Sequence, residues 1–398
     1  MKPASNESTP SKKRASVLVV AGETSGESHA ADLIRSLRSR LPEYELEVFG
    51  SGGARMREEG VELLMDVAQL AAIGPWAALA KAANYWRFFR TVLRSARERE
   101  PKFAVLVDFP DFNLRLAKRL KRLGIPVCYY ISPQLWAWRQ SRVNLIRRYV
   151  DLMLVILPFE KDFFRNHGIE AVYVGNPTAS RLRHLGYLKA ERKAVENEPP
   201  VLALLPGSRQ KEVELILPVM LEAARYIEKE IEIRCWIVRA PGLPEGILRG
   251  ICDRWRGDGG RTLSLEILSG ETDEFLWRAD SAMVKSGTST LEAMLLETPF
   301  AMVYRLSLLS WLMLRPFVKV QTYCLANLVA GKRIVPEFVQ RDATPGNIGA
   351  YLVSVLSDPS KRSLVVENLR NASARLGEGD SYEEGAEQIV NVFFSSRN

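Results

Sequence analysis

Short apolar runs alternate with amphipathic stretches along the first half of the chain. The pattern predicts strands over 16–21, 45–49, 103–108, 127–131 and 152–157, with helices over 27–40 and 113–123. Such alternation is typical of parallel βαβ units in a doubly wound sheet. Ligands of these sheets bind beyond the carboxyl ends of the strands, where Glu23, Asp108, Ser132 and Glu160 fall.

The alternation stops at a polar stretch, 186–200, and then restarts. Further strands are predicted over 201–205, 232–238, 264–268, 281–284 and 299–303. We therefore expect an α/β protein with two tandem doubly wound, Rossmann-like domains facing a cleft. The expected organisation is a basic tail (1–15), an N-terminal domain (16–185), a linker (186–200), a C-terminal domain (201–365) and helices over 366–398. The last helical stretch, 367–394, is a candidate to pack back on the first domain.

Composition narrows the classes of partner. The chain has 398 residues, a formal charge of +8 and 47% hydrophobic residues, so a soluble fold with an anionic partner is expected. A generally basic surface is the plain alternative, and no helix-turn-helix, RRM or zinc module supports nucleic-acid binding. Four scattered cysteines and three histidines predict neither a disulfide framework nor a metal site. No apolar run is long enough to span a bilayer, although 305–323 could lie on one.

Two strand–turn–helix segments carry the candidate chemistry. Leu204-Leu-Pro-Gly-Ser-Arg209 lets the backbone approach a ligand and adds a fork-shaped cation. Ser281–Glu292 places hydroxyls and backbone N–H groups at a helix start, where anions bind, and a carboxylate about one turn later. Two phosphate-binding loops and a carboxylate for sugar hydroxyls indicate a sugar nucleotide.

Seven motifs in a fixed order carry a resemblance to a known family. They are AGETSG (21–26), DFPDFN (108–113), YISPQLWAWR (130–139), LPFEK (157–161), LPGSR (205–209), SGTSTLE (286–292) and ANLVAG (326–331). Together they resemble lipid-A-disaccharide synthase, a two-domain GT-B glycosyltransferase, from about residue 16 to 347.

The resemblance implies an inverting reaction. UDP-2,3-diacylglucosamine and 2,3-diacylglucosamine 1-phosphate would form the β-1,6-linked disaccharide 1-phosphate and UDP, without a cofactor. It also implies a cytoplasmic enzyme at the inner face of the inner membrane. The N-terminal domain would then face the acceptor and the membrane, and the C-terminal domain would bind the UDP-sugar. Oligomeric state is left open.

The resemblance assigns roles in the first domain. Asp108 matches the proposed general base, and Glu23 would bind the acceptor or position catalytic groups; a plain turn with Ser25 as helix cap is the alternative for Glu23. Asp111 is either a cleft residue or a helix cap. The other cleft candidates are Ser25, Ser132, Gln134, Trp138 and Arg139. Trp136 and Trp138 would stack on a sugar or base, or fill the core.

In the second domain, the resemblance implies a UDP-sugar site. Arg209 would clamp the diphosphate, and Glu292 would bind the ribose hydroxyls; a surface arginine and an exposed helix carboxylate are the alternatives. Asn327 would contact the diphosphate or donor sugar. The remaining donors are Gly207, Ser208, Ser286, Gly287, Thr288 and Ser289.

An apolar, basic stretch over 73–94 is the candidate membrane or acyl-chain surface. Its alternative is an amphipathic helix that packs on its own sheet. The residues concerned are Trp76, Leu79, Trp86, Phe88 and Phe89. The chain departs from the family pattern at Ala77, Asn176 and Lys285, which bears on acceptor preference.

Three other functions stay open. They are a UDP-sugar 2-epimerase, a GT-B transferase with a soluble acceptor, and a bilobal binding protein without catalysis. An epimerase has no need of the apolar surface near Trp76, and a binding protein would release no UDP.

Overall fold

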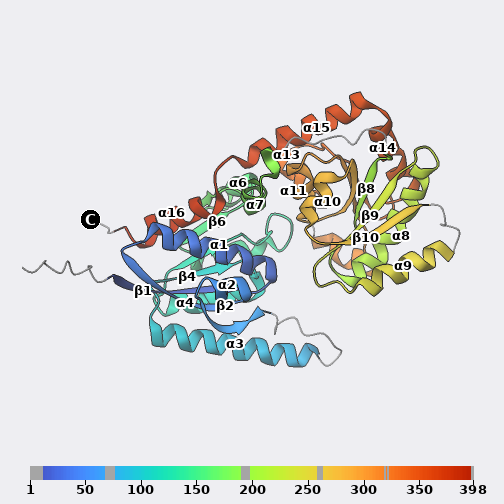
Figure 1. Ribbon diagram of the computed structural model, residues 1–398. Coiled ribbons are helices and arrows are strands. Elements are labelled where there is room, and N and C mark those ends of the chain that lie inside the picture. Colours follow the sequence, from blue (N-terminus) through green and yellow to red (C-terminus); the bar gives the residue numbers. More distant parts are fainter. Residues whose placement is uncertain are drawn as a thin grey trace, which may run out of the picture. The chain divides into compact units, whose positions relative to one another are not determined.

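The computed structural model describes residues 12–67, 77–189, 198–257, 263–317, 320 and 322–395. The chain divides into two compact units (Figure 1). Unit 1 comprises residues Met1–Pro177 and Gly379–Asn398, and unit 2 comprises Thr178–Glu378. The division falls at Pro177, ahead of the stretch 186–200 that the sequence suggested as a linker, and residues 190–197 of that stretch lie outside the description.

Unit 1 is built on a seven-stranded parallel sheet in the order β3-β2-β1-β4-β5-β6-β7. Its strands are β1 (Lys13–Ala21), β2 (Tyr44–Gly52), β3 (Glu62–Asp66), β4 (Phe103–Val107), β5 (Val127–Tyr130), β6 (Leu152–Val155) and β7 (Ala171–Tyr173). The central strands are buried on both faces, as their unbroken Val, Leu and Ala runs require. The edge strands β3 and β7 were not expected, because they are short and half-buried.

Helices cover both faces of this sheet (Figure 1). One face packs against α1 (Thr24–Arg40), α2 (Ala54–Glu58) and α16 (Ser381–Phe393). The other packs against α3 (Ala77–Arg99), α4 (Pro110–Arg122), α5 (Val143–Tyr149) and α6 (Pro158–Asn166). Phe393 of α16 stacks on Phe103 of β4 at 4.6 Å between ring centroids, so the end of the chain completes this core.

Unit 2 repeats the plan with a six-stranded parallel sheet in the order β10-β9-β8-β11-β12-β13. Its strands are β8 (Val201–Leu205), β9 (Arg234–Arg239), β10 (Ser264–Ser269), β11 (Ser281–Lys285), β12 (Phe300–Tyr304) and β13 (Glu337–Val339). Helices α8 (Gln210–Glu228), α9 (Glu245–Gly257) and α14 (Pro345–Ser357) bury their apolar faces on one side. The expected doubly wound α/β class is therefore confirmed for both units.

The remaining helices of unit 2 complete it. They are α7 (Pro177–His184), α10 (Thr272–Arg278), α11 (Ser289–Leu295), α12 (Leu308–Leu314), α13 (Leu325–Ala330) and α15 (Pro359–Ser373). Unit 2 also has the 3-10 turns η3 (Tyr187–Lys189), η4 (Arg315–Phe317) and η5 (Ala374–Leu376), and unit 1 has the 3-10 turn η2 (Gln140–Arg142). The helical stretch expected over 367–394 is two helices. The first, α15, ends at Ser373 and is followed by η5, whose C-cap residue, Gly377, has a positive φ of 71°. Asp380 caps the second, α16, by accepting from Tyr382 N and Glu383 N.

Candidate functional site

Four candidate residues of unit 1 follow the carboxyl ends of neighbouring strands. β1, β4, β5 and β6 lie side by side, and they lead into Glu23, Asp108, Ser132 and Glu160 respectively. This placement follows from the topology, because all four strands run parallel and end at the same edge of the sheet.

Asp108 follows β4 in a left-handed backbone conformation, with φ of 45°, and Phe109 repeats it with φ of 47°. Such residues cost on the order of 1–3 kcal/mol each and need support from their surroundings. Tyr129 Oη and Asn113 Nδ2 donate to the carbonyl oxygen of Asp108 at 2.6 and 2.8 Å. The turn therefore fixes the backbone of Asp108 through its carbonyl oxygen.

The electrostatics of Asp108 suit a proton acceptor. Burial raises the pKa of its carboxyl to about 6, and the negative charge of Glu23 acts in the same direction. A backbone hydrogen bond from Phe109 opposes both effects. Asp108 is thus ionised at neutral pH but more basic than a solvated aspartate, which is the property a general base needs.

The turn that carries Glu23 fits against the turn that carries Asp108. A Cβ at Gly22 would lie 2.1 Å from the ring of Phe109, so no larger residue fits there. Glu23 is exposed and forms the N-cap position of α1 without a side-chain capping bond. The side chain of Ser25, the expected cap, lies outside the described part.

Glu160 is a buried carboxylate that collects four donors. Its Oε1 accepts from Ser132 Oγ at 2.6 Å and Trp136 Nε1 at 3.1 Å, and its Oε2 accepts from the Ile156 and Leu157 N–H groups at 3.2 and 3.0 Å. Burial raises its pKa to about 7 against the pull of these bonds. Ser132 and Trp136 therefore act as donors to Glu160. The Trp136 side chain is buried, which agrees with the alternative that it fills the core.

In the rest of the SPQLWAWR segment, Pro133 and Leu135 are buried, whereas the residues at 134, 138 and 139 face solvent. Trp138 and Gln134 are exposed, and the Arg139 guanidinium lies 4.3 Å from the centre of the Trp138 ring. Asp111 pairs with Arg142 and, at 3.3 Å, with Arg139. It lies inside α4 and does not cap it, so the capping alternative for Asp111 is wrong. This pair anchors the start of α4 to the Arg139 turn.

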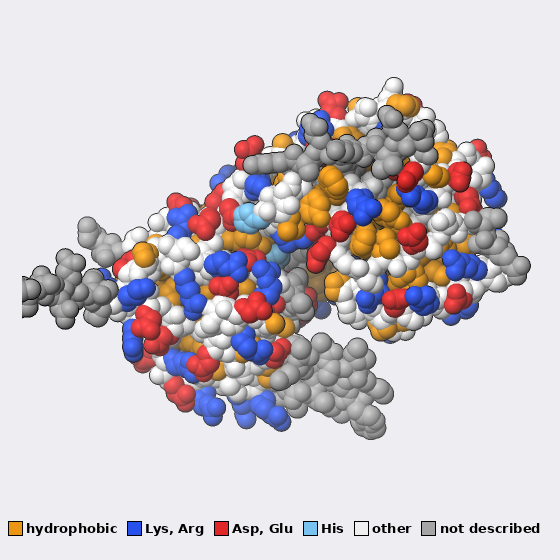
Figure 2. All heavy atoms as spheres, in the orientation of Figure 1, with side chains coloured by type: hydrophobic (Ala, Val, Ile, Leu, Met, Phe, Trp, Pro, Cys, Tyr) orange, Lys and Arg blue, Asp and Glu red, His pale blue; other side chains and the backbone are white. Residues whose placement is uncertain are grey.

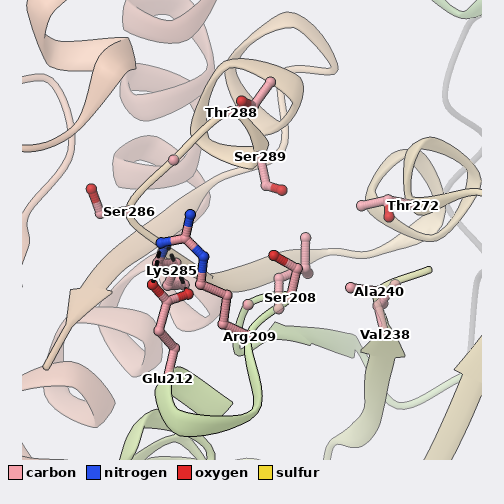
Figure 3. A pocket seen from close by; sticks show the side chains of 13 residues that line it. Ser208, Arg209, Glu212, Val238, Ala240, Thr272, Lys285, Ser286, Thr288 and Ser289 are labelled. Atoms are coloured by element: carbon pink, nitrogen blue, oxygen red, sulfur yellow. Dashed lines mark ion pairs between the residues drawn. The ribbon is translucent and has the colours of Figure 1, made fainter. Parts of the chain in front are cut away.

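In unit 2, a pocket of about 290 Å³ opens at the carboxyl ends of β8, β9 and β11 (Figure 3). Both polar and apolar residues line it. The residues are Leu205, Gly207, Ser208, Arg209, Glu212, Val238, Ala240, Thr272, Lys285, Ser286, Gly287, Thr288 and Ser289. The structure thus brings the two expected anion-binding loops together in one pocket.

Two cations in this pocket share one carboxylate. Glu212 Oε2 lies 3.1 Å from Lys285 Nζ, and Glu212 Oε1 lies 3.6 Å from Arg209 Nη1 (Figure 3). Gly207 has φ of 116°, a conformation that suits glycine, and a Cβ there would lie 3.2 Å from Glu212 Oε2. Lys285, noted as a departure, is therefore part of the pocket, and sequence reasoning missed Glu212.

Glu292 lies beside a second ion cluster. Arg181 of α7 donates to Glu292 Oε1 at 3.2 Å and to both oxygens of the buried Asp273, at 3.0 Å to Oδ1. Burial and the charge of Asp273 raise the pKa of Glu292 to about 7, while Arg181 and a hydrogen bond with Ser289 lower it. Nothing in the sequence pointed to Arg181, since 111 positions separate it from Glu292.

Asn327 has a different place from the one expected. Its side chain is 1% exposed; Nδ2 donates to Val335 O and Glu337 Oε1, and Oδ1 accepts from the N–H groups of Ile334 and Val335. With these four bonds it holds the 334–337 segment, and its expected contact with the diphosphate or donor sugar stays a prediction.

Helix α3 also differs from expectation in part. Phe88 and Phe89 are buried and pack on Phe112. The expectation that these two residues belong to a membrane surface is therefore wrong. Trp86 is 54% exposed with Arg90 over its ring at 4.8 Å, and Figure 2 shows basic side chains along this outer edge of unit 1. Trp76 and the side chains of Ala77 and Leu79 lie outside the described part.

The comparisons with known proteins decide the family. A family model described as lipid-A-disaccharide synthetase matches residues 17–393. The chain belongs to the lipid-A-disaccharide synthase family. A family member from Myxococcus xanthus is 41% identical over 379 residues, which cover 94% of this chain and 97% of that protein. This chain is accordingly a glycosyltransferase.

Solved structures agree on the fold. UDP-GlcNAc 2-epimerase from Neisseria meningitidis, bound to UDP-GlcNAc, superposes with a TM-score of 0.62 at 12% identity. The match covers 96% of this chain and 100% of the epimerase chain. The calicheamicin glycosyltransferase gives 0.59 at 14% identity, covering 97% and 100%. Their likeness confirms the GT-B architecture.

Two absences hold for the described residues. No group of three or more histidine, cysteine or acidic side chains there could hold a metal ion. No helix in the same part of the chain is long and apolar enough to cross a membrane.

Proposed function

We propose that this glycosyltransferase joins UDP-2,3-diacylglucosamine to 2,3-diacylglucosamine 1-phosphate. The products are the β-1,6-linked disaccharide 1-phosphate and UDP, with inversion at the anomeric carbon. The observation that carries the proposal is family membership across residues 17–393 together with an intact set of Asp108, Arg209 and Glu292.

Each step of the transfer has a residue suited to it. Asp108, with a pKa of about 6, takes the proton of the acceptor 6-hydroxyl. The hydroxyl oxygen attacks the anomeric carbon, and the bond from that carbon to the diphosphate breaks. The negative charge that leaves with UDP is stabilised by Arg209 and Lys285, which line the pocket. Glu292 accepts hydrogen bonds from the ribose hydroxyls.

Residues of unit 1 are proposed to serve the acceptor. Glu23 raises the pKa of Asp108 through its charge, so its role is to tune the base. Trp138 and Arg139 offer an exposed ring and a cation, which suit a sugar phosphate. Trp86 and its basic neighbours on α3 are proposed to contact the cytoplasmic face of the inner membrane. Neither nucleic acid nor a cofactor is required.

The test is UDP release from UDP-diacylglucosamine in detergent, with and without diacylglucosamine 1-phosphate. We expect release only when the acceptor is present, together with a β-linked disaccharide seen by NMR. Release without the acceptor would indicate hydrolysis. Conversion of the donor to its 2-epimer would favour the epimerase alternative and overturn the proposal.

A further inference from the structure

The five most exposed large apolar side chains in the described part of the chain lie together on one short segment. This segment is α12 with η4, in unit 2. The exposed side chains are Leu308 (73%), Leu309 (70%), Leu312 (65%), Met313 (61%) and Phe317 (63%). Single exposed leucines are ordinary, but five within ten residues form a patch that marks an interaction surface.

The segment is fixed at its base, which keeps the patch outward. Gln340 binds the backbone of Leu306 twice, accepting from its N–H at 2.7 Å and donating to its carbonyl at 3.2 Å. Ser307 caps α12 by accepting from Ser310 N at 3.3 Å. Trp311 turns the other way and packs against Tyr323, with ring centroids 6.3 Å apart. Residues 308, 309, 312 and 313 then share the opposite side of the helix.

The charged residues that flank this patch in the sequence have one sign. From residue 298 to 336 the sequence contains no aspartate or glutamate, while it contains Arg305, Arg315, Lys319, Lys332 and Arg333. Arg315 is exposed beside the apolar residues, and Arg305 precedes them. An apolar face flanked by arginines is typical of helices that lie in the interface of an anionic bilayer.

We infer that α12 and η4 dock onto an anionic lipid bilayer. Leu308, Leu309, Leu312 and Met313 enter the boundary between head groups and acyl chains, and Arg305 and Arg315 meet lipid phosphates. A second copy of the chain fits less well, because a symmetric contact would bring the same arginines together. A seven-residue helix is about 10 Å long, so it lies on the bilayer and does not cross it.

None of the five patch residues lines the pocket, and Trp86 on α3 belongs to unit 1. It gives unit 2, which carries the proposed UDP-sugar pocket, a membrane contact of its own. The inference does not depend on the transfer reaction, since lipid binding is measured without substrates.

The experiment is sedimentation of the full chain with vesicles of phosphatidylcholine, with and without phosphatidylglycerol. The variant is the double substitution Leu309→Ser and Leu312→Ser; the matched control is Leu364→Ser with Val392→Ser, two apolar residues exposed elsewhere. We expect the first variant to lower partitioning onto anionic vesicles at least about tenfold and the control to leave it unchanged. Arg305→Gln with Arg315→Gln should lower it about tenfold as well and reduce its salt dependence.

Two outcomes would overturn the inference. Unchanged partitioning of the leucine variant is one. The other is a wild-type dimer that the leucine variant converts to a monomer in light scattering without lipid, because the patch would then bind a second copy. UDP release from substrates in detergent micelles is measured on the same samples. If the wild type shows no transfer but the lipid result holds, the proposed reaction fails and this inference stands.

Discussion

Glu212 and Lys285 form an ion pair at 3.1 Å beneath the anion-binding loops of unit 2, and Arg209 lies on the other oxygen of the same carboxylate at 3.6 Å. In the free enzyme the carboxylate therefore holds two cations in place while competing with any anionic ligand for them. The two partners of the pair should affect ligand binding in opposite directions.

We expect Lys285→Met to raise the Kd for UDP about tenfold, because a pocket cation is lost. Glu212→Gln should lower the Kd, because the competing charge is removed while both cations remain. Isothermal titration calorimetry measures both, with Glu214→Gln on the same helix as control. Weaker binding in both variants would mean that the pair only maintains the shape of the pocket.

Asp108→Asn should stabilise the protein at alkaline pH. A carboxyl with a folded pKa of about 6, above its ordinary 3.8, destabilises the folded state once ionised. This cost is complete above pH 6 and vanishes below pH 4. The variant should therefore gain up to roughly 3 kcal/mol at pH 8 and little at pH 4. Asparagine also tolerates the left-handed backbone.

Denaturant unfolding of both proteins at the two pH values measures this gain. Asp162→Asn, an exposed aspartate of α6, is the control and should show no such pH dependence. An Asp108→Asn variant that is less stable than wild type at pH 8 would contradict the environment described for this carboxyl.

Arg181→Met should move the titration of Glu292. The arginine donates to Glu292 Oε1 at 3.2 Å, and without it the Glu292 pKa rises above its value of about 7. Since the ionised carboxylate is the better acceptor for ribose hydroxyls, UDP affinity should strengthen at a higher pH than in wild type. Calorimetry between pH 6 and 9 tests this, with Arg249→Met on the surface of α9 as control. An unshifted pH profile would show that Arg181 does not control the titration of Glu292.

Trp136→Phe should destabilise the protein more at pH 8 than at pH 5. It removes the Nε1 donor, 3.1 Å from Glu160 Oε1, and so raises the pKa of that buried carboxyl further. The resulting loss, roughly 1.5–3 kcal/mol for a bond to a charged group, applies when Glu160 is ionised and fades as it protonates. Trp138→Phe, at an exposed position, should change stability little at either pH. Equal losses at both pH values would point to packing alone.

Much of the fold followed from local pattern. The buried central strands have unbroken apolar runs, so their positions agree with prediction to within a few residues. The short strands β3, β7 and β13 carry too few apolar residues for a pattern to show. The C-terminal helical stretch is interrupted at Gly377, and the sequence pattern did not predict this interruption.

The candidate site likewise contains residues that the sequence pattern predicts and residues that it does not. Asp108, Glu23 and the two anion-binding loops follow strand ends, so topology places them. Arg181, Glu212 and the four donors of Glu160 depend on side chains that meet only after folding. Phe88 and Phe89 looked like a surface because the pattern shows that a helix has an apolar side, but only packing on Phe112 shows where that side turns.

The most direct test of the central claim is disaccharide formation by wild type, Asp108→Asn and Asp162→Asn from the two diacylglucosamine substrates, followed across pH. We expect wild type and Asp162→Asn to form the disaccharide with a rate that falls below about pH 6, as Asp108 takes up its proton. Asp108→Asn should bind UDP normally and form almost no disaccharide. An Asp108→Asn protein that transfers at the wild-type rate would contradict the assignment of Asp108 as the base.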